Sequence, residues 1–199
     1  MELHPQNLEK ALQLLGKLLA IRKREPFWLV ICGGSALLAR QIISRSTHDV
    51  DVLALRDLEG GVDLAYPLPE ALNQAAGHVA EELDLEPNWL NSAASLHFPD
   101  LRLLPASLWQ ELDTRVYSDS LKVSFVTRNG QILLKLYAAL NRVQARDFDD
   151  LSALSPDSTE TANALRWLLT KLPVLTHRDQ LPALLTHLGH GHLIPEFQD

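Results

Sequence analysis

The sequence of 199 residues contains a single cysteine and no long apolar run. One cysteine excludes an internal disulfide, and Cys32 stands in an apolar stretch where we expect a buried, unreactive side chain. No stretch approaches the roughly 20 apolar residues that a membrane-spanning helix needs. The N-terminal residues lack the basic start and apolar centre of a signal peptide, so we expect a cytoplasmic location and no membrane partner.

Positive charge is also scarce. The chain has 18 lysines and arginines against 25 aspartates and glutamates, which gives a formal net charge of −7. Non-specific binding to nucleic acid is driven by neutralisation of phosphates and normally needs a basic protein. We therefore expect no general DNA or RNA binding, although this composition leaves room for a local basic patch.

The spacing of apolar residues predicts strands and helices in the first two-thirds of the chain and mostly helices at the end. An apolar run that ends at a glycine pair predicts a strand over residues 27–31. A second run, which follows a polar loop, predicts a strand over residues 48–55. Further short strands are predicted over 101–104, 115–117 and 121–126. Helices are predicted over residues 7–24, 35–43, 69–83, 131–144, 161–172 and 181–188.

Two carboxylates stand two residues apart on the second predicted strand. Because side chains alternate across a strand, Asp49 and Asp51 should face the same way, with Cα atoms about 6.5–7 Å apart. Two carboxylates on one face repel each other unless a cation or hydrogen-bond donors intervene. Mg²⁺ and Mn²⁺ prefer oxygen ligands, so the pair indicates a metal site. A solvated edge strand is the alternative.

A glycine turn precedes this pair. The order of a strand, then Gly33, Gly34 and Ser35, then a helix places backbone N–H groups at a helix N-terminus, where the partial positive charge favours phosphate. A simple turn that needs a positive φ at glycine is the alternative. A phosphate-binding turn beside two carboxylates is the arrangement expected for metal-assisted chemistry on a nucleotide.

These residues carry a resemblance to a known superfamily. Gly33-Gly34-Ser35, followed by Arg-Ser-Thr-His-Asp-Val-Asp-Val over residues 45–52, resembles the first motif of the DNA polymerase β-like nucleotidyltransferases. The form is most similar to the minimal, toxin-type branch, the AbiEii- and MenA-like proteins. Residues 135–140 and 146–151 resemble the helical signature of that branch, and residues 84–91 resemble a Trp-Leu-Asn segment of some members. The resemblance extends over roughly residues 30–154.

The resemblance implies an α+β fold in which helices flank a nucleotidyltransferase-like mixed β-sheet. Residues 1–154 would form this domain, and residues 155–199 would form a helical C-terminal extension packed on it. Asp49 and Asp51 would bind Mg²⁺ or Mn²⁺, Lys135 would contact the triphosphate, and Asp147 or Asp150 would act as a further acid. The nucleotide would be held by Gly33, Gly34, Ser35, Arg45, Thr47 and Arg146.

The implied activity is Mg²⁺-dependent transfer of a nucleotidyl group from an NTP to an RNA or protein acceptor. The toxin-type branch implies a toxin with an antitoxin partner. The sequence departs from the superfamily pattern in one respect, because the predicted strands over 101–104 and 121–126 hold no internal carboxylate, and Asp100 at the edge of the first is the nearest. Either Asp147 or Asp150 substitutes, or the protein is a catalytically degenerate nucleotide-binding or protein-interaction module. A dinucleotide-binding fold is disfavoured because the Gly-x-Gly-x-x-Gly fingerprint is missing.

Overall fold

The computed structural model describes residues 2–21, 25–98, 100–142, 144–171 and 176–197. The chain divides into two compact units, residues 1–127 and residues 128–199. The domain division after residue 154 stays a prediction. None of the helices in the described ranges combines the length and the apolar character that crossing a membrane requires.

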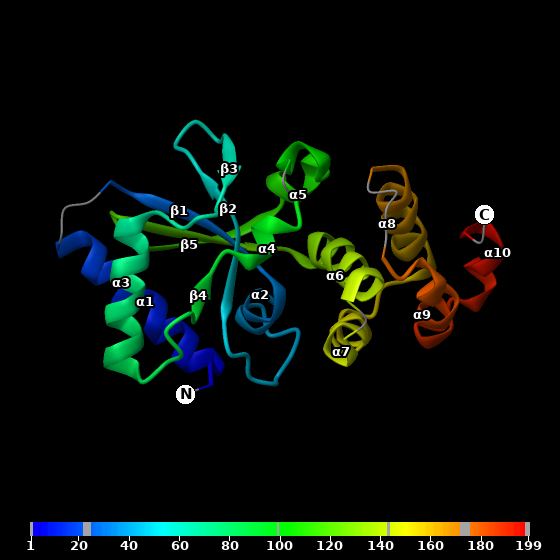
Figure 1. The fold of residues 1–199 in the computed structure, drawn as a ribbon, viewed down its shortest axis with the longest axis horizontal. Coiled ribbons are helices and arrows are strands. Elements are labelled where there is room, and N and C mark those ends of the chain that lie inside the picture. The colour runs from blue at the N-terminus through cyan, green and yellow to red at the C-terminus, as the bar shows by residue number, and fades with distance from the viewer. Residues whose placement is uncertain (1, 22–24, 99, 143, 172–175, 198–199) are drawn as a thin grey trace. The chain divides into compact units, whose positions relative to one another are not determined.

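The first unit is built on a mixed β-sheet that has six strands in the described residues (Figure 1). The main path runs in the order β3-β2-β1-β6-β5, and β4 pairs with β2 beside this path. β1 is antiparallel to β2 and parallel to β6, and β2 is parallel to β4. The strands are β1 (Phe27–Cys32), β2 (Val50–Arg56), β3 (Val62–Leu64), β4 (Leu90–Asn91), β5 (Leu112–Ser118) and β6 (Leu121–Val126).

Two long helices cover one face of this sheet. The buried residues of α1 recur at helical spacing, and those of α3 do the same, so each helix turns one apolar stripe toward the sheet. Val50 and Val52 of β2 are fully buried in the same core. Because side chains alternate along a strand, Asp51 faces the opposite side of the sheet. The helices of this unit are α1 (Pro5–Ile21), α2 (Gly33–Ala39), α3 (Glu70–Leu83), α4 (Ala93–Leu96) and α5 (Ala106–Gln110).

The second unit is helical in its described part. α6 packs against both α7 and α8. The guanidinium of Arg128, at the start of α6, binds the carboxylate of Glu160 on α8 and donates to the carbonyl oxygen of Leu154 at 3.1 Å. Its elements are α6 (Arg128–Arg142), α7 (Ala145–Leu154), α8 (Ser158–Lys171), η2 (Arg178–Gln180), α9 (Leu181–His187), η3 (Gly191–Leu193) and α10 (Ile194–Phe197). The predicted α+β class, with a mixed sheet flanked by helices and a helical C-terminal region, is confirmed.

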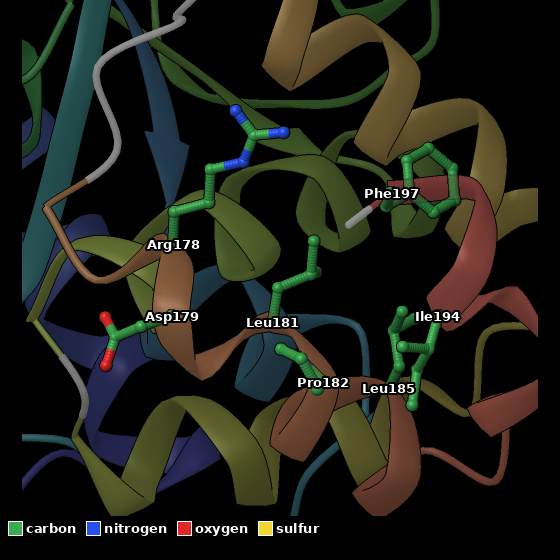
Figure 2. Close-up of a pocket in the computed structure, with 7 residues that line it drawn as sticks. All are labelled: Arg178, Asp179, Leu181, Pro182, Leu185, Ile194 and Phe197. Atoms are coloured by element: carbon green, nitrogen blue, oxygen red, sulfur yellow. The ribbon is translucent and has the colours of Figure 1, made fainter. Parts of the chain in front are cut away.

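A hollow of about 300 Å³ lies beside α9 in the second unit (Figure 2). Apolar side chains supply most of its lining, among them Leu181, Leu185, Ile194 and Phe197, and Arg178 and Asp179 add polar groups. None of the predicted site residues, all of which lie in the described ranges, lines this hollow.

Some boundaries differ from the sequence predictions. The predicted strand over residues 101–104 is wrong, because the turn η1 (Leu101–Leu103) forms there and the carboxylate of Asp100 accepts the backbone N–H of Arg102 at 3.0 Å. The predicted start of the second strand at residue 48 is also wrong, since β2 begins at Val50 and Asp49 precedes it. Residues 22–24 and residue 172, at the ends of two predicted helices, lie outside the described residues.

Candidate functional site

β1 ends at Cys32, and the chain turns into α2 through Gly33 and Gly34. Gly33 has a φ of +69°, in the left-handed region that glycine adopts without a steric penalty. A Cβ atom at Gly33 would lie 2.7 Å from Oδ2 of Asp51, which is closer than real Cβ contacts come. The turn therefore brings glycine backbone directly against the Asp51 carboxylate.

Ser35 follows in the first turn of α2. Its side chain is fully buried, and its hydroxyl donates to the carbonyl oxygen of Cys32 at 3.3 Å. The hydroxyl thus satisfies a backbone acceptor where the strand ends and ties the helix to it. Contact of Ser35 with a nucleotide stays a prediction.

The loop before β2 closes on Gly34. A Cβ atom there would lie 3.2 Å from Oγ1 of Thr47 and 3.6 Å from Nη2 of Arg45. Thr47 is almost fully buried, and its backbone exchanges two hydrogen bonds with Leu3, at 3.0 Å and 2.7 Å. The loop therefore holds a hydroxyl and a guanidinium beside the glycine turn, although the intervening helix separates them from it in sequence.

The two predicted metal ligands come from different kinds of backbone. Asp51 is half-buried on β2 and pairs with Cys32 of β1. Asp49 is half-buried in the loop just before the strand, and its Oδ1 lies 3.4 Å from Oγ1 of Thr47. Thr47 is thus placed to orient the Asp49 carboxylate. Binding of a metal by Asp49 and Asp51 stays a prediction.

A third oxygen-bearing side chain lies beside Asp51, and the sequence did not single it out as a site residue. β4 pairs with β2 so that Asn91 is the partner of Asp51. Paired residues on neighbouring strands point to the same face of a sheet, so the carboxamide of Asn91 adjoins the carboxylate. Its Oδ1 accepts the backbone N–H of Ala93 at 2.9 Å. A strand of two residues is too short to show a pattern of alternating apolar and polar side chains. The sequence therefore gives no signal that would identify Asn91 as a site residue.

The oxygen donors of Asp49, Asp51 and Asn91 fit a hard cation. Mg²⁺ is commonly bound through one or two carboxylates, with water and substrate phosphates completing its coordination. Among the described residues, no group of three or more histidines, cysteines, aspartates or glutamates could hold a metal.

A second cluster of predicted residues lies in the second unit. The Nζ atom of Lys135, on α6, lies 3.0 Å from Oδ1 of Asp147 and 2.6 Å from Oδ2 of Asp150, both on α7. The exposed fractions of these side chains are 6%, 0% and 1%. The guanidinium of Arg142 donates to both carboxylate oxygens of Asp147, at 2.7 Å and 2.9 Å. The aspartates are three residues apart on one helix face, so a single ammonium reaches both.

Opposing effects set the pKa of Asp147. Burial raises the pKa of this carboxyl, but the hydrogen bonds from Arg142 and the charge of Lys135 outweigh burial and bring the pKa below its ordinary value. The ammonium of Lys135 is paired within its own unit, so its contact with a triphosphate stays a prediction. Arg146, the remaining predicted residue, is exposed near the start of α7.

The structure thus gathers the predicted residues in two groups, each within its own unit. The first group surrounds the glycine turn, and the second is the buried ion-pair network of α6 and α7. The first group consists of Gly33, Gly34, Ser35, Arg45, Thr47, Asp49 and Asp51; the second consists of Lys135, Asp147 and Asp150.

A family model described as a nucleotidyltransferase of unknown function (DUF6036) matches residues 6–155. The matched range contains both groups of predicted residues. No curated protein and no solved structure matched the chain.

Proposed function

Because the chain belongs to this family of nucleotidyltransferases, we propose that it transfers a nucleotidyl group from an NTP, using Mg²⁺ or Mn²⁺ held by Asp49 and Asp51. The observation that carries the proposal is the packing of Gly33 against the Asp51 carboxylate, which lies 2.7 Å from the place where a Cβ atom would stand. Close backbone approach and a carboxylate at one point are what a metal-bound triphosphate requires.

The residues around the turn then have separate tasks. The ion, when bound, neutralises charge that develops on the phosphates during transfer. The guanidinium of Arg45 pairs with a phosphate oxygen, since its planar fork matches phosphate geometry. The hydroxyl of Thr47 orients Asp49, and the absence of side chains at Gly33 and Gly34 lets the Asp51 carboxylate and the Thr47 hydroxyl pack against the turn.

The acceptor in this proposal is a hydroxyl group of RNA or protein. Its oxygen attacks the α-phosphorus, pyrophosphate leaves, and the hydroxyl proton passes to a base. Asp147 and Asp150, which the resemblance implies as further acids, belong to the second unit. Their pairing with Lys135 at 3.0 Å and 2.6 Å favours a supporting role in which the network fixes α7 against α6.

We further propose that the protein belongs to the toxin-type branch and that an antitoxin partner controls its activity. The support is the second block of resemblance, in which Lys135 on one helix is followed by Arg146, Asp147 and Asp150 on the next. Expression of the chain alone should then slow the growth of its host, and the Asp51→Ala variant should relieve this effect. Equal growth of cells carrying either protein would count against the toxin role.

The transfer activity can be tested with α-labelled NTPs. The protein is incubated with Mg²⁺, each NTP in turn, and cellular RNA and protein. We expect label on one acceptor class with at least one NTP, and loss of label in Asp51→Ala. The matched control is Asp63→Ala, at an exposed position on β3. If no NTP transfers label to either acceptor class, the proposal fails.

A non-catalytic nucleotide-binding or protein-interaction module is the second candidate. The observation that favours it is the neutral side chain of Asn91 beside Asp51, where a third carboxylate would complete a stronger metal site. Isothermal titration calorimetry separates the candidates, because NTP binding without transfer to any acceptor supports the module.

A further inference from the structure

A row of side chains crosses the sheet at the end opposite the glycine turn, and the proposed reaction does not use it. The strand register pairs Arg56 with Val62, Trp28 with Lys122, and Lys122 with Val116. These residues belong to β2, β3, β1, β6 and β5, so the row crosses all five strands of the main path. β1 runs from this row toward the glycine turn, and the four residue-to-residue steps from Trp28 to Cys32 at the end of the strand span about 13 Å.

Trp28 is the centre of this row. Because Leu29 pairs with Leu55, the next residues outward, Trp28 and Arg56, are neighbours on the other face of the sheet. Cζ of Arg56 lies 4.7 Å from the centre of the Trp28 ring, and Nζ of Lys122 lies 5.1 Å from it. Both distances fall within the range of cation–π attraction. The ring therefore has a cation supplied by each neighbouring strand.

The indole is held in a fixed orientation. Its Nε1–H donates to the hydroxyl of Ser124 at 2.7 Å, and that fully buried hydroxyl lies 2.7 Å from the hydroxyl of Thr114. The Trp28 side chain remains half-buried, and Val116 at the end of the row is 67% exposed. A fixed aromatic ring loses little conformational entropy when a planar group stacks beside it.

The two cations lack carboxylate partners within the described ranges, although the protein is acidic. Neither Arg56 nor Lys122 forms an ion pair there, whereas Arg40, Arg115 and Arg128 all do. Two backbone carbonyl groups orient the Arg56 guanidinium instead. Its Nη1 donates to the carbonyl oxygen of Trp109 at 3.5 Å, and its Nη2 donates to the carbonyl oxygen of Gly60 at 3.4 Å. Within the described ranges, both cations of the row thus have no carboxylate at ion-pair distance, which leaves them available to an anionic ligand.

We propose that this row binds single-stranded nucleic acid, with a base against Trp28 and phosphates on Arg56 and Lys122. Fixed aromatic rings flanked by cations are the elements that bind single strands without sequence preference. An acidic peptide would use the two cations but would leave the ring and the apolar ends of the row unused. Binding of this kind needs neither NTP nor metal, so the inference goes beyond the proposed transfer reaction and stands independently of it.

Fluorescence anisotropy tests the inference directly. Labelled single-stranded RNA, single-stranded DNA and duplex RNA, each of about 12 nucleotides, are titrated without NTP or divalent ions at about 50 mM salt. The double variant Arg56→Gln/Lys122→Gln should bind single strands about 10-fold more weakly, and its salt slope should shrink by about 1.4. Trp28→Leu should weaken binding about 5-fold or more. Comparison of the affinities for single-stranded RNA and single-stranded DNA shows which of the two the row binds.

The matched control is Lys10→Gln/Lys17→Gln, which removes the same charge from exposed positions on α1 and should bind like the wild type. No binding by the wild type, equal losses in the two double variants, or equal competition by polyglutamate would overturn the proposal. If the row variants do not fold, photocrosslinking of the wild type decides, because adducts at Trp28 or Lys122 support the row and adducts only elsewhere refute it. Failure of NTP transfer leaves all these outcomes unchanged.

Discussion

Gly33 has no room for a side chain because the carboxylate of Asp51 fills the space: a Cβ atom would lie 2.7 Å from Oδ2. The same residue has a φ of +69°, which L-residues with a side chain rarely adopt. Steric fit and backbone conformation thus each require glycine at this position, where the glycine turn meets the strand that carries Asp51.

Gly33→Ala should therefore destabilise the protein. The left-handed conformation alone costs an alanine roughly 1–2 kcal/mol, and the collision with Asp51 adds to this cost. The contrasting variant is Gly77→Ala, in the interior of α3 with no atom within 4 Å of an added Cβ, where alanine should stabilise the helix by about 0.5–1 kcal/mol. Urea denaturation of both variants measures the change in the free energy of unfolding, which should be opposite in sign for the two. A neutral Gly33→Ala would contradict the close packing.

Asn91→Asp should convert the site into one with a third carboxylate. Without metal, repulsion between the introduced carboxylate and that of Asp51 should lower stability, because like charges on adjacent strands disfavour each other. Added Mn²⁺ should restore it, with binding tightened on the order of tenfold. Calorimetric titration measures the affinity. Asn73→Asp, at an exposed position on α3, is the control and should leave Mn²⁺ binding unchanged.

Lys135→Met should destabilise the second unit strongly. It would leave Asp147 and Asp150 buried without the ammonium that now lies 3.0 Å and 2.6 Å away, and breaking a buried ion pair in this way costs about 3–5 kcal/mol. Lys171→Met, at an exposed position on α8, removes the same charge and should cost little. Chemical denaturation compares the two. Equal, small losses would show that the network contributes little to stability.

The depressed pKa of Asp147 predicts a loss of stability in acid. In the folded protein this pKa lies below its ordinary value, so the ionised carboxylate stabilises the fold above the unfolded-state pKa of about 3.9. That stabilisation decreases as the pH falls through the folded-state pKa. Denaturation between neutral and strongly acidic pH should show a smaller decline for Asp147→Asn than for the wild type. The exposed neighbour Asp149→Asn serves as the control, and identical declines for all three proteins would refute the prediction.

Much of the fold could be predicted from local sequence. β1 is a continuous apolar run, whereas β6 alternates apolar residues with Lys122 and Ser124, and β6 begins and ends where the sequence predicted. The predicted strand at residues 101–104 is wrong because three leucines in four positions suit either conformation. Capping by Asp100 stabilises a helical turn there, and the apolar pattern carries no information about that hydrogen bond.

The sequence by itself determined the glycine turn, the acidic pair and the longer strands and helices, because these depend on backbone sterics and on the spacing of apolar side chains. The short strands β3 and β4 carry no such pattern. Only the tertiary structure decided which groups become neighbours. The pairing of β2 with β4 brought Asn91 beside Asp51, and the packing of α6 on α7 enclosed Lys135 between two aspartates. Such contacts arise from strand register and helix packing between segments distant in the chain, and no local pattern specifies them.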